Sequence, residues 1–71
     1  MATIFDIITE AIREQARNGR TQQDIADELG IAQTMVSGIL RGTRRVGRKT
    51  AEAVLQANPF WLQEFLWRRS R

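Results

Sequence analysis

The sequence predicts a compact all-α domain of five helices, and three observations support this class. Its 71 residues suffice for one hydrophobic core and leave no room for a second domain, so residues 1–71 are treated as one domain. Apolar residues recur at the helical period, and no stretch has the pattern of a strand. Residues that favour helix ends separate the apolar stretches.

Each predicted helix is bounded by residues that favour its ends. Thr3 and Thr21 each precede an aspartate by three residues, which is the spacing of a capping box. Glycine suits the left-handed residue that follows a helix. The predicted elements are, in order, a helix over 4–17 ended by Asn18-Gly19, a helix from Thr21 to Gly30, a helix from Gln33 to Arg41-Gly42, a loop over 41–49, a helix containing Thr50, Ala51, Val54 and Leu55, and a helix over about 59–69 begun by Asn58-Pro59.

The positive charge is concentrated in the second half of the chain. Residues 1–40 carry three arginines against six carboxylates, whereas residues 41–71 carry eight cations against two carboxylates. Five of these cations lie in the segment 41–49, RGTRRVGRK, which contains no acid. This concentration predicts a polyanionic partner, and a solvated loop is the alternative.

The missing residue types exclude most catalytic and metal chemistry. Without His or Cys the chain has no zinc finger, no cysteine nucleophile and no Ser-His-Asp arrangement. We therefore expect no enzyme, no catalytic residues, no metal and no cofactor. The N-terminal residues carry acids and no basic segment at their start, and no apolar run approaches the ~20 residues of a membrane span. We expect a cytoplasmic protein.

The most specific pattern lies in residues 21–42, TQQDIADELGIAQTMVSGILRG. Ala26 is small enough for two short helices to cross closely, and Gly30 permits a left-handed turn between them. Val36 and Ile39 supply branched apolar residues beneath the second of these helices. This is the spacing of a helix-turn-helix over about 21–41, and with the basic loop behind it the pattern predicts binding to double-stranded DNA. An unrelated small helical bundle is the alternative.

At these residues the chain resembles the phage repressor and Cro-like helix-turn-helix domains, the lambda-repressor-like fold, over nearly its whole length. The segment 41–57, RGTRRVGRKTAEAVLQA, also looks like the loop and helix of Lac-repressor-type headpieces. Because no sensor domain follows, the resemblance implies a free-standing repressor of the Cro kind, with no small-molecule effector, in a bacterial or phage-infected host cell.

The resemblance also implies roles for individual residues. The candidates for reading bases in the major groove are Gln33, Thr34, Met35 and Ser37. A glutamine amide pairs bidentately with adenine, which makes Gln33 the foremost of them, whereas Met35 either contacts a thymine methyl or is partly buried. The candidates for phosphate or groove contacts are Thr21, Gln22, Arg41, Arg44, Arg45, Arg48 and Lys49.

Two residues depart from the family pattern. Ala32 stands where many members carry a Ser or Thr cap, which costs about 1 kcal/mol of helix stability. Gly38 places no side chain on the recognition face, and it either allows a close backbone approach or is simply tolerated. Direct readout of bases is then expected to be limited.

The predicted fifth helix carries aromatic residues on two faces. Trp61, Leu62, Phe65 and Leu66 share one face, while Phe60 and Trp67 fall nearly opposite. Either one ring folds over the domain edge, or the second face packs on a symmetry mate. The candidates for the interface of such a homodimer are Phe60, Gln63, Glu64 and Trp67. A two-fold dimer presents its recognition helices ~34 Å apart and therefore predicts a palindromic operator.

Two other functions remain open from the sequence. An antitoxin-type autoregulator would add a protein partner to DNA binding. The segment 60–71, FWLQEFLWRRSR, also resembles a membrane-surface helix, because aromatic residues are mixed with arginines. The favoured hypothesis is a repressor that blocks a promoter by occupying an operator, without membrane contact, effector or cofactor.

Overall fold

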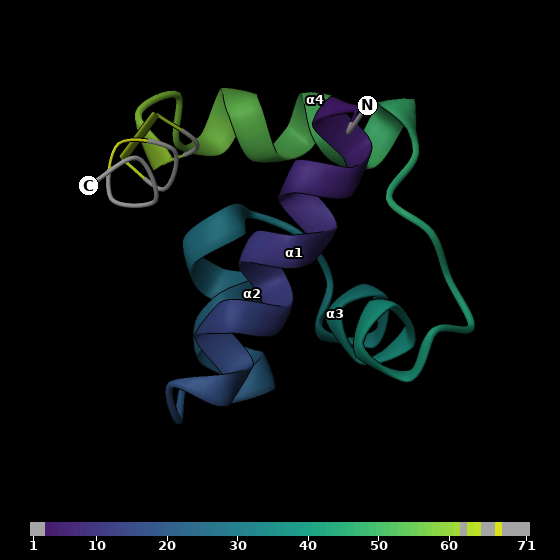
Figure 1. Ribbon diagram of the computed structural model, residues 1–71. Helices are drawn as coiled ribbons and strands as arrows, with labels where there is room; N and C mark the ends of the chain where they lie inside the picture. Colours follow the sequence, from purple (N-terminus) through teal and green to yellow (C-terminus); the bar gives the residue numbers. More distant parts are fainter. Residues whose placement is uncertain (1–2, 62, 65–66, 68–71) are drawn as a thin grey trace.

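Within its described residues the chain folds into four complete α-helices: α1 (Ile4–Arg17), α2 (Gln22–Leu29), α3 (Gln33–Arg41) and α4 (Arg48–Ala57). A computed structural model describes residues 3–61, 63–64 and 67, and within these residues there is no strand. The all-α class is therefore confirmed (Figure 1).

The predicted fifth helix lies partly outside the described residues. The described residues of that segment with helical backbone are Trp61, Gln63, Glu64 and Trp67. The amide of Glu64 donates a hydrogen bond to the carbonyl of Phe60 at 2.9 Å, which is one helical bond. Residues 62, 65–66 and 68–71 lie outside the description, so four complete helices are established and the fifth stays a prediction.

Local capping accounts for the starts of α1 and α2. Thr3 Oγ1 accepts a hydrogen bond from the Asp6 amide at 3.2 Å, and the Asp6 carboxylate accepts one from the Thr3 amide at 3.1 Å. At α2 the Thr21 hydroxyl accepts from the Asp24 amide at 3.0 Å, and no reciprocal bond forms. The first capping box is thus complete, whereas only half of the box predicted at Thr21 is formed.

The start of α4 differs from the prediction. Arg48 and Lys49 were expected in the loop, but α4 begins at Arg48 with Gly47 at its N-cap. Gly47 has no side chain to accept an amide, and two cations lie at the positive end of the helix dipole, so local preference does not explain this start. Thr50, Ala51 and Val54 are buried, and this packing holds the first turn in place.

The core lies where the four helices meet. Its buried apolar residues are Ile8, Ala11, Ile12, Ile25, Ala26, Leu29, Val36, Ile39, Val46, Ala51, Val54 and Trp61. They include the apolar residues predicted to lie inside the helix-turn-helix, which are Ala26, Val36 and Ile39. Val46 fixes the α3–α4 loop to the core, and Trp61 fixes the segment that follows α4.

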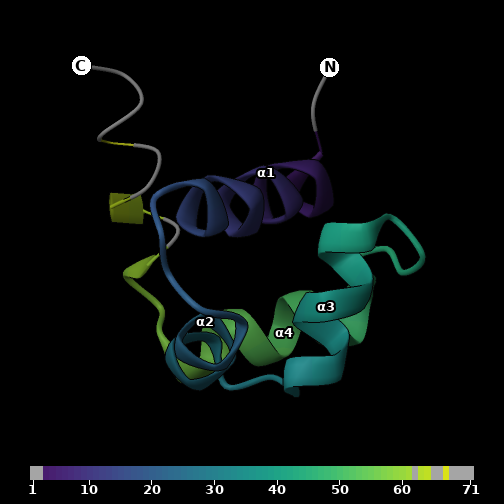
Figure 2. The same cartoon turned by 90° about the horizontal axis from the view of Figure 1, so that it is seen from below.

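The helices α2 and α3 form the predicted helix-turn-helix. In Figure 1 the axis of α2 lies in the plane of the picture and α3 is seen along its axis. In Figure 2 α2 is seen along its axis and α3 lies in the plane, so the two helices cross steeply. The turn between them contains Gly30 in the left-handed conformation, with φ of 70°. A Cβ atom on Gly30 would lie 2.7 Å from Cβ of Ala57, at the end of α4. The turn therefore rests directly on α4.

Candidate nucleic-acid interface

The helix α3 lies at one edge of the molecule (Figure 2), and its polar residues form a stripe on one of its faces. Gln33 and Thr34 are exposed in its first turn, and Ser37 is half-buried one turn later. Residues three and four apart share a helix face, so these three side chains lie together. Val36 and Ile39 are fully buried on the opposite side. The helix can therefore offer hydrogen-bonding groups to a ligand without disturbing the core.

Met35 lies at the edge of this stripe. Its side chain is half-buried and packs against the hydrophobic core. Met35 is thus partly buried, and its contact with a thymine methyl stays a prediction.

The first turn of α3 has no side-chain cap. Ala32 is the N-cap residue, with an extended backbone at φ −71° and ψ 145°, and it makes no side-chain hydrogen bond. An extended backbone of this kind suits a serine, whose hydroxyl would accept one of the exposed amides of the first turn.

Ala32→Ser is expected to stabilise the domain by about 1 kcal/mol, because it supplies the missing cap. In a domain of this size that gain raises the midpoint of thermal unfolding by about 4–8 °C. Calorimetry on the two proteins measures the shift, and Ala32→Val, which offers no acceptor, serves as the control. An unchanged midpoint for Ala32→Ser would show that the amides of α3 already have equivalent partners.

Thr21 and Gln22 lie at the exposed start of α2. The Thr21 hydroxyl oxygen accepts from the helix as its cap, yet its proton remains available for donation. Gln22 is the first residue of α2 and is half-buried. Both positions are compatible with a phosphate contact, because backbone amides and the helix dipole favour an anion at a helix start.

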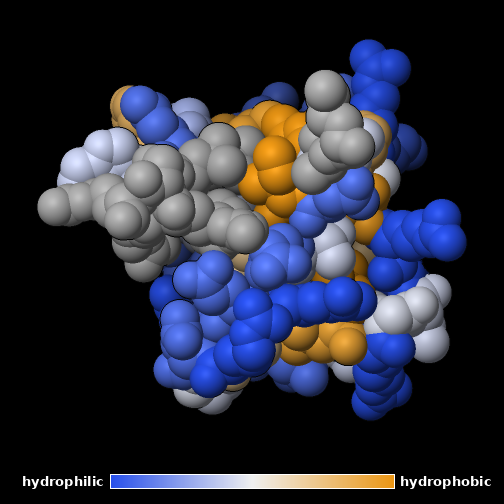
Figure 3. Space-filling model, in the orientation of Figure 1, coloured by the Kyte–Doolittle hydropathy of each residue, from blue (hydrophilic) through white to orange (hydrophobic). Residues whose placement is uncertain are grey.

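The predicted cluster of cations spans three elements. Arg41 ends α3, Arg44 and Arg45 lie in the α3–α4 loop, and Arg48 and Lys49 begin α4. All five are exposed. The α3–α4 loop runs along one edge of the molecule in Figure 1. In the same orientation, Figure 3 shows hydrophilic side chains projecting along that edge.

Only one of these five cations has a carboxylate partner among the described residues. Arg48 Nε donates to Glu52 Oε1 at 3.2 Å, and both side chains are well exposed. An exposed pair of this kind is weak and yields readily to a stronger anion. Elsewhere Arg17 pairs with Glu10 and Arg20 pairs with Glu28. The four cations without a carboxylate partner, which are Arg41, Arg44, Arg45 and Lys49, carry a positive charge that is not locally compensated.

Gly38 does not lie on the exposed stripe. It is buried, and a Cβ atom at this position would lie 2.7 Å from Cγ of Arg44. Neither alternative given for this glycine, a close backbone approach on the recognition face or simple tolerance, anticipated its burial against Arg44. The approaching group is the chain's own loop, a contact that the spacing of α3 alone did not indicate.

The segment after α4 divides its aromatic residues as the sequence predicted, as far as it is described. Trp61 is 3% exposed, whereas Phe60 and Trp67 are 68% and 60% exposed. Leu62, Phe65 and Leu66, predicted to share the face of Trp61, lie outside the described residues. We call Phe60, Gln63, Glu64 and Trp67 the C-terminal aromatic surface. These four residues line a concavity of about 360 Å³.

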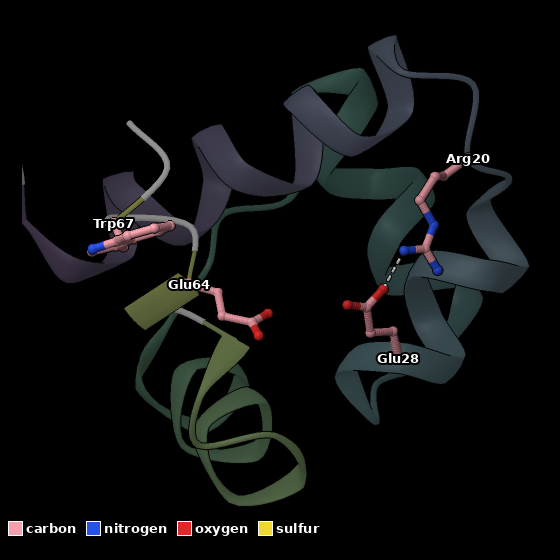
Figure 4. Close-up of a pocket in the computed structure, with 4 residues that line it drawn as sticks. All are labelled: Arg20, Glu28, Glu64 and Trp67. Carbon is pink, nitrogen blue, oxygen red and sulfur yellow. Dashed lines mark ion pairs between the residues drawn. The ribbon is translucent and has the colours of Figure 1, made fainter. Parts of the chain in front are cut away.

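A second concavity of about 460 Å³ adjoins this surface. Figure 4 shows the Arg20–Glu28 ion pair on one side of it and Glu64 and Trp67 on the other. The pair links the α1–α2 connection to the end of α2. Sequence reasoning missed this pair, since its two residues lie on either side of the start of α2.

Two further findings concern metal sites and membrane spans. Among residues 3–61, 63–64 and 67 there is no group of three or more carboxylates able to hold a metal ion. In the same part of the chain no helix combines the length and the apolar character needed to cross a membrane.

Comparison with known proteins identifies the family. No curated protein and no solved structure matches the chain. The family model described as helix-turn-helix matches residues 10–58, which covers α2, the turn, α3, the basic loop and α4. This family binds DNA and is non-enzymatic, which confirms the expectation that the chain is not an enzyme. The chain therefore belongs to the helix-turn-helix family of lambda-repressor-like DNA-binding transcription regulators.

Proposed function

We propose that the chain is a sequence-specific repressor that binds an inverted-repeat operator in double-stranded DNA as a homodimer. The observation that carries this proposal is the polar stripe of Gln33, Thr34 and Ser37, which lies on the helix that precedes the uncompensated cations of the loop. Bases are read by hydrogen bonds in the major groove, and phosphates fix the orientation of the protein. The two parts of this surface supply the two kinds of contact.

The stripe suits base recognition because its first residues are exposed and polar. Gln33 begins α3, so its amide extends from the helix end that enters the groove in this docking geometry. The amide NH₂ can donate to N7 of adenine, and the amide oxygen can accept from the N6 amino group. Thr34 and Ser37 add hydroxyl groups that both donate and accept.

The four uncompensated cations in and beside the α3–α4 loop suit phosphate contacts. Arg41, Arg44, Arg45 and Lys49 are exposed and have no carboxylate partner among the described residues. Each contact with a phosphate releases a condensed counterion, which gives affinity for any duplex and a strong dependence on salt. Specificity then comes from the smaller number of groups on α3.

The C-terminal aromatic surface supports the homodimer. Phe60 and Trp67 expose more than half of their area, which is a large apolar area for a small domain to leave in water. A two-fold contact through this surface would bury both rings. Recognition helices ~34 Å apart place the two-fold axis ~17 Å from α3, a distance shorter than the 31 Å extent of the protomer.

Selection of bound sequences from a random duplex pool tests the proposal. The pool is incubated with the protein at near-physiological salt, and the retained duplexes are sequenced. We expect enrichment of an inverted repeat whose half-sites lie about one helical turn apart. Enrichment of no sequence would contradict specific binding, and enrichment of a single half-site would contradict the homodimer.

Trp67→Ala is expected to weaken the dimer at least about thirtyfold, which corresponds to the 2 kcal/mol typical of a central aromatic in an interface. Sedimentation equilibrium measures the dimer constant, and circular dichroism confirms that the variant remains helical. Phe5→Ala is the matched control, because Phe5 is 38% exposed on α1 and does not line the concavity of the C-terminal aromatic surface. A Trp67→Ala protein that dimerises like the parent would remove this surface from the interface.

A further inference from the structure

Most of the hydrogen bonds that join the start of the α3–α4 loop to the last turns of α3 converge on one carbonyl, and the Gly42 amide also donates to the carbonyl of Ile39 at 3.2 Å. The carbonyl oxygen of Gly38 accepts hydrogen bonds from the Thr43 amide at 2.9 Å and from the Arg44 amide at 3.1 Å. It also accepts from the Thr43 hydroxyl at 3.3 Å. Gly42, with φ of 82°, turns the chain so that these donors reach it. The first part of the loop is therefore fixed to α3.

The side chain of Arg44 lies against Gly38. A Cβ atom on Gly38 would approach Cγ of Arg44 to 2.7 Å, Cδ to 2.8 Å and Cβ to 3.1 Å. These atoms form the stem of the arginine, and its Cβ cannot move without the backbone that Gly38 holds. An alanine at position 38 therefore displaces the arginine stem.

Space, and not backbone conformation, explains the glycine. Among the described residues the glycines with positive φ are Gly19, Gly30 and Gly42, so Gly38 keeps an ordinary helical backbone. A glycine inside a helix is less favourable than any residue except proline. The contact with Arg44 is the compensating feature that the structure shows at this position.

We propose that Gly38 is a positioning residue that fixes the guanidinium of Arg44 beside the C-terminal end of α3 for contact with a DNA phosphate. This inference rests on the proposed function, in which the loop cations bind the DNA backbone. A side chain whose stem is already held loses less conformational freedom on binding than a free one. Arg45 follows directly in the chain, and none of the atoms nearest to a Cβ on Gly38 belongs to it, so it provides the natural comparison.

A double-mutant cycle tests the link between Gly38 and Arg44, and Arg45 provides its control. Arg44→Ala is expected to lower the steepness of log K against log salt concentration by about 0.9, and so to reduce affinity about eightfold at 0.1 M salt. Gly38→Ala is expected to lower both the steepness of the salt dependence and the affinity. Each change should be a large share of the change in Arg44→Ala. In the Arg44→Ala background Gly38→Ala should cause no further loss, whereas in the Arg45→Ala background it should keep its full effect.

The measurement is the affinity for the selected duplex and for a random duplex, each at several salt concentrations. The loss should be equal on both DNAs, because a phosphate carries no sequence information. Gly47→Ala is the glycine control, since a Cβ atom there meets nothing within 4 Å. It should leave the salt dependence unchanged. Thermal unfolding of each variant separates displacement of Arg44 from loss of the fold.

Two variants keep the test decisive if Gly38→Ala does not fold. Gly38→Ala combined with Arg44→Ala removes the two closest atoms, Cγ and Cδ, keeps only the Cβ of residue 44 at 3.1 Å and should fold, which would confirm the clash. Thr43→Val removes the hydroxyl bond to the Gly38 carbonyl, keeps the side-chain shape and should reduce the salt dependence slightly. If Thr43→Val leaves the salt dependence unchanged, the packing of Arg44 against Gly38 does not position its guanidinium.

The inference is also overturned by an unchanged salt dependence in Gly38→Ala, by an unchanged salt dependence in Arg44→Ala, or by a full further loss when Gly38→Ala is added to Arg44→Ala. A loss restricted to the selected duplex would also contradict the phosphate contact. Failure of the parent protein to bind any duplex counts against the proposed function itself, and so is distinguishable from these outcomes.

Discussion

Gly30→Ala is expected to lower the free energy of unfolding by about 2–5 kcal/mol, a large part of the stability of so small a domain. Two costs add at this position. Gly30 has φ of 70°, a conformation that costs an alanine about 1–2 kcal/mol. Its new Cβ would lie 2.7 Å from Cβ of Ala57, and forcing the turn away from α4 costs about 1–3 kcal/mol more. Urea denaturation measures the sum.

Gly19→Ala is the matched control for Gly30→Ala. Gly19 has φ of 90°, and a Cβ atom there meets nothing within 4 Å, so only the conformational cost applies. Adding Ala57→Gly to Gly30→Ala should recover part of the loss, because it removes the other atom of the contact. Equal losses for Gly19→Ala and Gly30→Ala would show that the turn does not depend on its packing against α4.

Gln33→Ala is expected to lose about 1–3 kcal/mol of binding free energy on the selected DNA site and little on random DNA. Gln33 is exposed at the first position of α3, so its truncation leaves the core intact. Titration of both duplexes with the parent and the variant gives the two differences. The ratio of specific to non-specific affinity should fall, because the phosphate contacts are unchanged.

Gln56→Ala is the control for this experiment. Gln56 is also an exposed glutamine, but it lies near the end of α4 that is remote from the basic loop. It should alter neither affinity. Equal losses for Gln33→Ala on the two duplexes would refute base recognition by Gln33, and would leave it a phosphate contact at most.

The starts of α1 and α2 and the ends of α2 and α3 followed from the sequence because their causes are local. Thr3 and Thr21 accept amides three residues later, and Gly30 and Gly42 adopt the left-handed conformation that ends a helix. Each of these interactions involves residues within one turn. A pattern of capping residues therefore predicts the boundary without knowledge of the tertiary fold.

The start of α4 could not be predicted in the same way. The segment RGTRRVGRK contains repeated charge and two glycines, which favour a loop. The helix nevertheless begins at Arg48, because residues in its first two turns are buried against the other helices. Burial of this kind depends on the positions of those helices, and the local pattern contains no information about them.

The candidate site shows the same division. The sequence predicted contacts by the cations of segment 41–49 and by the polar residues of α3, and the structure leaves the cations, Gln33 and Thr34 exposed and Ser37 half-buried. The sequence did not indicate that Arg44 packs against Gly38, because that contact depends on how the loop folds back on α3. The pair of Arg48 with Glu52 was accessible from the sequence, since the two residues are four apart on a helix.

The central claim is that two copies of α3 read two half-sites on the same side of the duplex. Changing the half-site spacing tests this most directly. Insertion of about five base pairs, half a helical turn, moves the second half-site to the opposite side of the DNA. The account predicts that the affinity then falls to that of a duplex with one half-site. An affinity unchanged by the insertion would contradict a rigid homodimer and would show that each protomer binds alone.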